Sequence, residues 1–138
     1  MSKMEVGGID AAVSALESLY RDTDKLQEAI LDGGAAIIKD QVEKALFQSG
    51  HMDSGELLAS IKIKKKTSKD GEKSRIIRPM GRDSKGVSNG YKGFVINYGK
   101  SGFTGSRFWD KGNALAEPEI KKMAEQEITL YYKQKGLI

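Results

Sequence analysis

His51 is the single histidine of the sequence, and histidine is the side chain most often used in acid–base catalysis. A Ser/His/Asp arrangement can be drawn with Ser54 or Ser60, but neither serine stands in the Gly-x-Ser-x-Gly turn that exposes a nucleophile. Because the chain has no cysteine, thiol catalysis, disulfides and thiolate metal sites are excluded. We therefore expect an ordinary surface histidine, and a hydrolase centred on His51 is the least favoured hypothesis.

Two other patterns resemble reactive sites only superficially. The stretch Gly99-Lys100-Ser101-Gly102 lacks the spacing of a phosphate-binding P-loop, and a mobile loop is the simpler interpretation. The carboxylate pairs Glu117/Glu119 and Glu125/Glu127 are two residues apart, so on a helix they face different directions. We expect no enzymatic activity, no cofactor and no metal.

Basic residues are concentrated in one segment. Residues 61–85 hold 10 basic and 3 acidic side chains, a local net charge of +7, whereas the rest of the chain carries −3. Such a segment has three interpretations: a solvated hairpin edge, a subunit contact, or a surface that neutralises DNA phosphates. Because the segment lacks aromatic residues, stacking on nucleic-acid bases is not expected. The candidate subunit or DNA contacts, including three residues of a later loop, are Lys62, Lys64, Lys65, Lys66, Lys69, Lys73, Arg75, Arg78, Lys100, Phe103 and Arg107.

The N-terminal third is predicted to be helical. Apolar residues recur from Ile9 to Tyr20 at the spacing of one helix face, and Asp22-Thr23-Asp24 then interrupts the pattern. Asp24 with Gln27 forms a plausible capping box for a second helix that would continue to Leu46. Gly33-Gly34 in its middle indicates either a kink or a close helix–helix crossing.

The middle of the chain alternates between apolar and polar residues from Ala59, which predicts a strand, and Asp70-Gly71 predicts a hairpin turn before a return strand over residues 73–80. Residues 91–98 are aromatic and β-branched and predict a further strand. Glycine-rich stretches at 81–90 and 99–106 are expected to be flexible loops.

A C-terminal helix is predicted from about residue 114 to 133, with Pro118 in its first turn. Its apolar stripe includes Ala116, Ile120, Met123 and Tyr131. The order predicts an α+β fold: N-terminal helices, an antiparallel meander of about three to four strands, and a C-terminal helix packed on the sheet.

The overall composition supports one domain spanning residues 1–138. A 38% hydrophobic and 30% charged chain of this length is typical of a globular protein. No apolar run approaches the roughly 20 residues that cross a bilayer, and the first residues lack the apolar stretch of a signal peptide. We expect synthesis in a cytoplasm and no membrane partner.

Three short patterns, taken in order, resemble the small tail-component or neck proteins of tailed bacteriophages. Ser54-Gly55-Glu56-Leu57-Leu58-Ala59-Ser60-Ile61 resembles their Thr-Gly-x-Leu-x-x-Ser-Ile, with serine for threonine. Tyr91-Lys92-Gly93-Phe94-Val95-Ile96-Asn97-Tyr98-Gly99 resembles a tyrosine, a short apolar strand and Glu-x-Gly-Thr, with Asn97 for the glutamate and Lys100 for the threonine. Phe108-Trp109-Asp110-Lys111 resembles a Phe-leading motif before a C-terminal helix, without the usual proline.

The resemblance implies a structural virion or prophage protein of the head–tail connector, neck or tail-completion region. It implies a homo-oligomeric ring of about six or twelve copies, contacts with other neck, portal-complex and tail proteins, and contact with packaged DNA. The protein would be made in the bacterial host cytoplasm and reside at the head–tail junction. Independently of the family, the motifs have a structural interpretation: Ser54-Gly55 caps a helical turn, residues 91–98 supply the central strand, and Phe108 and Trp109 anchor the C-terminal helix against the sheet. In this interpretation the motif residues build the core; they are Ser54, Gly55, Leu57, Ser60, Ile61, Tyr91, Phe94, Val95, Tyr98, Gly99, Phe108 and Trp109.

Overall fold

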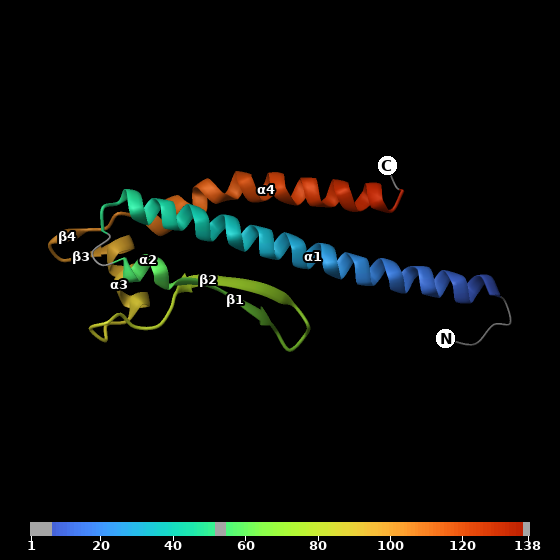
Figure 1. The fold of residues 1–138 in the computed structure, drawn as a ribbon, viewed down its shortest axis with the longest axis horizontal. Coiled ribbons are helices and arrows are strands. Elements are labelled where there is room, and N and C mark those ends of the chain that lie inside the picture. The colour runs from blue at the N-terminus through green and yellow to red at the C-terminus, as the bar shows by residue number, and fades with distance from the viewer. Residues whose placement is uncertain (1–6, 52–54, 137–138) are drawn as a thin grey trace.

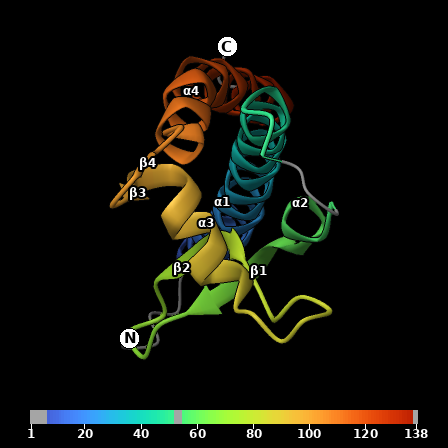
Figure 2. The same cartoon turned by 90° about the vertical axis from the view of Figure 1, so that its left-hand side faces the viewer.

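The computed structural model describes residues 7–51 and 55–136, with side chains in the first helix described from Arg21 onward. Ser54 therefore lies outside the described residues. Helices and strands follow one another in the order α1 (Gly7–Gln48), α2 (Glu56–Ser60), β1 (Ile61–Thr67), β2 (Lys73–Pro79), α3 (Asn89–Tyr98), β3 (Gly99–Lys100), β4 (Phe103–Thr104) and α4 (Phe108–Gln134). The fold is α+β, as predicted. α4 runs along one side of α1, and the β1–β2 hairpin lies on the other (Figures 1 and 2).

The N-terminal region is one continuous helix of 42 residues, so the predicted break at Asp22-Thr23-Asp24 is wrong. Each of these three polar residues bonds to a neighbouring element instead of capping a helix. Asp22 pairs with Lys135 after the end of α4, the Thr23 hydroxyl lies 3.3 Å from the Tyr131 hydroxyl, and Asp24 pairs with Lys73 of β2. Tertiary contacts satisfy the side chains that would otherwise favour a cap, and the helix continues.

Close packing between α1 and α4 explains the glycines in both helices. Gly112 of α4 is buried, and a Cβ placed on it would lie 2.6 Å from the Cα atom of Val42. A Cβ on Gly34 of α1 would lie 3.7 Å from Ile120, and one on Gly33 would lie 3.0 Å from the sulfur of Met123. Of the two interpretations of Gly33-Gly34, the helix–helix approach is the one the structure shows.

α4 begins at Phe108, six residues earlier than predicted, so Pro118 lies inside the helix and not in its first turn. Its missing N–H removes one backbone hydrogen bond from the helix. The predicted apolar stripe is correct, since Ala116 is buried and Ile120, Met123 and Tyr131 are partly buried.

The hairpin is confirmed with β1 and β2 antiparallel, Ile61 opposite Pro79 and Thr67 opposite Lys73. The strand predicted at residues 91–98 is wrong, because this segment is the helix α3. The other two strands, β3 and β4, form a separate small hairpin, so the four strands make two two-stranded sheets in place of one meander. Aromatic and β-branched composition favoured a strand, but the Ser88 side chain caps the N-terminus of α3 by accepting a hydrogen bond from the Tyr91 N–H.

The core lies where the elements converge, at the C-terminal end of α1. Val42 and Leu46 of α1, Leu57 of α2, Ile61 of β1 and Phe108 of α4 are buried together. Leu57, Ile61 and Phe108 therefore have the core role that the sequence predicts. Phe108 brings the first turn of α4 against the hairpin, whereas the rest of α4 follows α1.

At the opposite end, α1 extends past both the last turn of α4 and the tip of the hairpin (Figure 1). The contacts of Asp22 and Thr23 with Lys135 and Tyr131 mark where the α1–α4 pairing stops. Residues 7–20 of α1 thus form a helical extension of about 21 Å, at 1.5 Å per residue.

Gly112→Ala should lower the free energy of unfolding by about 1–3 kcal/mol, because the new methyl group would overlap the backbone of α1 at Val42. Gly34→Ala is the matched control in the partner helix. Its methyl group has room, and the gain in helix propensity of up to about 1 kcal/mol should leave stability unchanged or higher. Urea denaturation of both variants measures this difference, and equal destabilisation would contradict the proposed contact.

Candidate interaction surfaces

The β1–β2 hairpin presents its basic residues on two different faces. Side chains alternate along a strand, and residues opposite each other in the register share a face. Lys65, Lys73 and Arg75 fall on the face with Ile61 and Ile63, which is turned toward α1. On the opposite, outer face are Lys62, Lys64, Lys66 and Arg78.

The inner face is joined to α1 by what we call the ion-pair ladder: Asp24, Glu28 and Asp32 of α1 with Lys73 and Arg75 of β2. The three acids are four residues apart and so occupy one side of the helix. Lys73 Nζ lies 2.6 Å from Asp24 Oδ1 and 3.0 Å from Glu28 Oε1. Arg75 Nε lies 2.8 Å from Asp32 Oδ1, and its Nη2 lies 2.5 Å from Glu28 Oε2.

Arg75 is the most enclosed member of the ladder, with a side chain only 4% exposed. Hydrogen bonds from Lys73, and then Arg75, hold the pKa of Glu28 below its usual value, and Arg75 does the same to the pKa of Asp32. The pKa of Lys73 is raised in turn by its hydrogen bonds to Asp24 and Glu28. Lys73 and Arg75 were candidate contacts for other molecules, but in the folded chain they bind α1.

The outer face remains as a basic surface. Lys62, Lys64, Lys66 and Arg78 are exposed, and none of them forms an ion pair with any residue that the structure describes. The three lysines occupy alternate strand positions, so their Cα atoms are about 6.6 Å apart. Lys69 is also exposed, in the hairpin turn, and Lys65 is exposed with a 3.9 Å approach to Asp32.

α3 carries an aromatic ridge made of Tyr91, Phe94 and Tyr98. These residues were predicted to be in the core, but they are 60%, 60% and 50% exposed. Their spacing of three and four residues places them along one side of the helix. The rings of Phe94 and Tyr98 have centroids 4.8 Å apart, and the Arg107 guanidinium lies over the Tyr98 ring at 5.0 Å. Large apolar residues grouped on a surface in this way are typical of a binding site.

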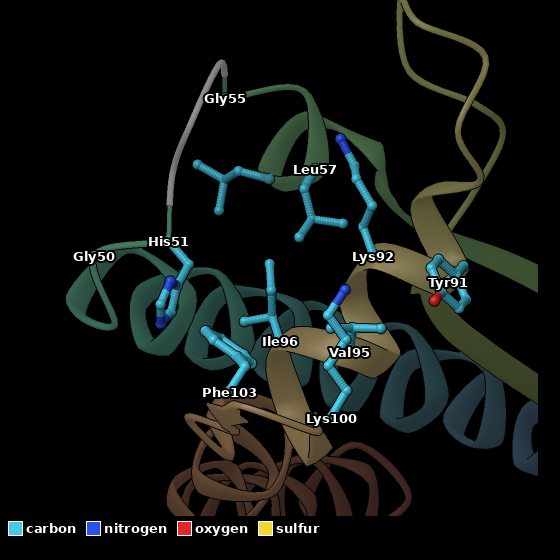
Figure 3. Close-up of a pocket in the computed structure, with 11 residues that line it drawn as sticks. Gly50, His51, Gly55, Leu57, Tyr91, Lys92, Val95, Ile96, Lys100 and Phe103 are labelled. Atoms are coloured by element: carbon cyan, nitrogen blue, oxygen red, sulfur yellow. The ribbon is translucent and has the colours of Figure 1, made fainter.

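A first groove, of about 580 Å³, lies on one side of this ridge between α2 and α3 (Figure 3). Leu57 of α2 faces Val95 and Ile96 of α3 across it, and His51 and Phe103 close one end. Leu58 also lines this groove. The His51 and Phe103 rings meet edge to face at 5.2 Å. His51 is therefore half-buried in an apolar setting and not an ordinary surface residue, and no carboxylate is among the described residues of the groove.

The second groove, of about 540 Å³, lies on the other side of α3 and is called the Trp109 groove here. Its apolar lining includes Pro79, Met80 and Trp109, together with Phe94 and Tyr98 of the aromatic ridge. Arg78 lines it as well, so a basic group borders an apolar surface. Trp109 is half-buried, which agrees with its predicted role as an anchor of α4.

Asn97 positions α3 relative to α4. Its side chain is buried, and its Oδ1 accepts a 3.0 Å hydrogen bond from the N–H of Trp109 in the first turn of α4. Gly105 packs against the same corner, since a Cβ there would lie 2.3 Å from the Asn97 carbonyl oxygen. Asparagine thus serves as a cap between two helices at the position where the resembled family has glutamate.

Asp83 organises residues 81–88. Its Oδ1 accepts hydrogen bonds from the N–H groups of Lys85 and Val87, and its Oδ2 pairs with Lys92 of α3 at 2.7 Å. The hydrogen bond from Lys92, and then those from the Val87 and Lys85 N–H groups, hold the pKa of Asp83 below its usual value. Both segments predicted to be flexible loops, 81–90 and 99–106, contain such defined turns, and α3 already begins at Asn89.

The remaining predicted residues are divided between core and surface. Ser60 is buried and donates to the Leu57 carbonyl at 2.6 Å, while Gly55 has a φ of 79° just before α2, a conformation that favours glycine. Gly99 likewise has a φ of 85° at the end of α3. Lys100 and Arg107 are exposed, and Phe103 and Val95 are half-buried.

Comparisons with known proteins add no relative: no family model, no curated protein and no solved structure matches the chain. Among the described residues, no helix is long and apolar enough to cross a membrane. In that same part of the chain, no group of three or more histidine, aspartate or glutamate side chains is arranged to hold a metal ion.

Acid should loosen the hairpin from α1. Because the pKa values of Glu28 and Asp32 are depressed in the folded chain, their contribution to stability is present above their ordinary values of about 4 and is lost as pH falls through the folded values. Lys73, whose pKa is raised, keeps its contribution until pH rises through its folded value. The double variant Glu28→Gln/Asp32→Asn should therefore show a flatter decline in unfolding free energy as pH falls from about 5 to about 2.

The matched control is Glu117→Gln/Glu125→Gln, which removes two exposed carboxylates of α4. Urea denaturation at several pH values should give this control the wild-type profile. A ladder variant that keeps the full wild-type pH dependence would show that these pairs do not stabilise the fold.

Proposed function

We propose that the chain is a structural subunit of the head–tail connector, neck or tail-completion region of a tailed bacteriophage or prophage, acting by self-assembly and docking. The observation that carries the proposal is the aromatic ridge of α3, with three large rings at least half exposed on one helix face. Such a surface suits a protein–protein contact. The resemblance of the sequence motifs supplies the biological setting.

The arrangement of the chain suits a rigid building block. α1 and α4 form a closely packed helix pair, and the ridge and both grooves lie at one end of it (Figures 1 and 2). A contact between different surfaces of identical subunits closes into a ring when the rotation permits. The ring of about six or twelve copies, its portal-complex and tail neighbours and its place in the virion come from the resemblance alone.

Docking would use a preformed surface. Asp83 and Asn97 fix the turns on both sides of α3, so the ridge is already in place before a partner arrives. Less ordering on binding means a smaller entropic cost. Residues 81–90 and 99–106, which were expected to be flexible loops, would thus frame a surface that is formed before docking.

Phe94→Glu/Tyr98→Glu, introduced into the encoding phage or prophage, should block the joining of heads to tails, because charged groups would replace the exposed rings. Electron microscopy of lysates should show filled heads and separate tails, and the infectious titre should fall by at least about tenfold. The isolated variant should keep the wild-type circular dichroism spectrum, since both rings are largely outside the core.

Tyr132→Glu is the control, since it places the same charge on an exposed aromatic position near the far end of α4. It should leave the titre unchanged. Normal joining by the α3 variant would rule out the ridge as the assembly surface.

A second candidate function, DNA binding by the hairpin, is favoured by the outer basic face. Four cations that neutralise four phosphates of duplex DNA give a slope of about −3.6 for the logarithm of affinity against the logarithm of salt concentration. Electrophoretic mobility shifts should reveal this slope, and Lys62→Glu/Lys64→Glu/Lys66→Glu should abolish it. Lys121→Glu/Lys122→Glu on α4 is the matched control; absence of binding by the wild-type chain at low salt would eliminate this function.

A further inference from the structure

The self-assembly proposed above requires a contact, and the two ends of the chain offer one. We propose that residues 7–20 of α1 in one copy dock onto the aromatic ridge and the Trp109 groove of the next copy. The contact is head to tail and involves two different surfaces. The inference rests on the proposed function and specifies the partner of its binding surface as a second copy of the chain.

The first surface is the extension of α1 past α4 (Figure 1). Thr23 bonds to Tyr131 of α4, so the row of α1 positions that includes Thr23 faces α4. Leu16 and Ile9 precede Thr23 by seven and fourteen residues and belong to the same row, which drifts only about 20° per seven residues. The row of α1 positions that faces α4 therefore continues along the helix after α4 has ended, and the sequence has apolar residues at positions 9 and 16 of that row.

The second surface lies at the opposite end of the molecule, where α3 is found (Figure 1). Phe94 and Tyr98 stand between solvent and the Trp109 groove, and Pro79, Met80 and Trp109 complete its apolar lining. An amphipathic helix that lays its apolar row into a hydrophobic groove is a recurring mode of recognition. The aromatic ridge and the Trp109 groove form the accepting surface. The extension supplies the helix, with apolar residues seven positions apart.

The charges of the two surfaces favour this head-to-tail contact over a symmetric contact between two extensions. Residues 7–20 contain Asp10 and Glu17 and no basic residue, and Arg21 follows them. On the acceptor side, Arg78 lines the Trp109 groove, and Arg107, which also pairs with Asp110 at 3.4 Å, lies over the Tyr98 ring. Two extensions packed on each other would bring like charges together, while an extension on the groove brings opposite charges together. A second copy of the chain therefore complements the groove in both polarity and charge.

A mixing experiment tests the head-to-tail arrangement. Leu16→Glu damages only the extension and Phe94→Glu damages only the ridge, so each variant alone should be monomeric. An equimolar mixture should form a 1:1 dimer and nothing larger, because each complex retains one intact pair of surfaces. Native mass spectrometry reads both results, and circular dichroism confirms that each variant is folded.

Other outcomes identify other contacts. If Leu16→Glu is monomeric, Phe94→Glu still assembles and the mixture gives no 1:1 dimer, the extension pairs with itself and the proposal falls. Assembly by Leu16→Glu together with loss of assembly by Phe94→Glu would mean that the ridge takes a different element, which also overturns it.

If the wild-type chain is monomeric at accessible concentrations, the same contact can be tested with a fluorescently labelled peptide of residues 5–21. Fluorescence anisotropy should show binding to the Leu16→Glu chain and at least a tenfold loss with Phe94→Glu. Arg78→Glu/Arg107→Glu should cause a similar loss, and an Asp10→Lys/Glu17→Lys peptide should restore it. No binding, or no effect of the charge swap, would refute the contact, whereas head–tail joining that still depends on Phe94 and Tyr98 would leave the proposed function standing.

Discussion

The approach of α4 to α1 at Gly112 is the constraint on which the rest of the structure depends. With no side chain between them, the two helix backbones meet at Val42, and this contact places Phe108 beside Leu46 and Ile61. The core of the chain is small, so the same few residues connect α1, α2, the hairpin and α4. Any residue larger than glycine at this crossing would separate the elements that enclose the core.

The ion-pair ladder assigns different roles to residues of one type. Lys73 and Arg75 are held by three acids of α1, whereas Lys62, Lys64 and Lys66 of the neighbouring strand face solvent. The high local charge of the hairpin is thus partly neutralised within the chain, and the part that remains is confined to the outer face. A count of basic residues overstates the charge available to a partner. Side chains alternate between the two faces of a strand, so among the described strand residues only the cations on the outer face are free.

The sequence predicted correctly those elements whose local helix, strand or turn preference agrees with the contacts they make in the folded chain. The α4 stripe, the Asp70-Gly71 turn and the core roles of Leu57, Ile61 and Phe108 belong to this group. The errors arose where long-range contacts override local preference. Asp24 resembles a cap but binds Lys73, 49 residues away. The other two acids of the ladder, Glu28 and Asp32, are recognisable in the sequence only as part of a four-residue repeat of acids.

α3 was misassigned for a related reason. Its aromatic and β-branched residues favour a strand, but Ser88 before it and Gly99 after it are helix-boundary signals that carried more information. Because the segment was taken as a buried strand, the exposure of Tyr91, Phe94 and Tyr98 was not foreseen, and neither was the groove beside them. A side chain's position relative to solvent depends on which element covers it, and here no described element covers the ridge.

Asn97 has a consequence for how the chain transmits force. Its amide fastens the last turn of α3 to the first turn of α4, and α4 is in turn locked to α1 at Gly112. A force on the aromatic rings would pass through one buried, hydrogen-bonded corner into two long antiparallel helices, with no flexible linker between them. A displacement of α3 would then be transmitted along α1 to its N-terminal end, some forty helical residues away.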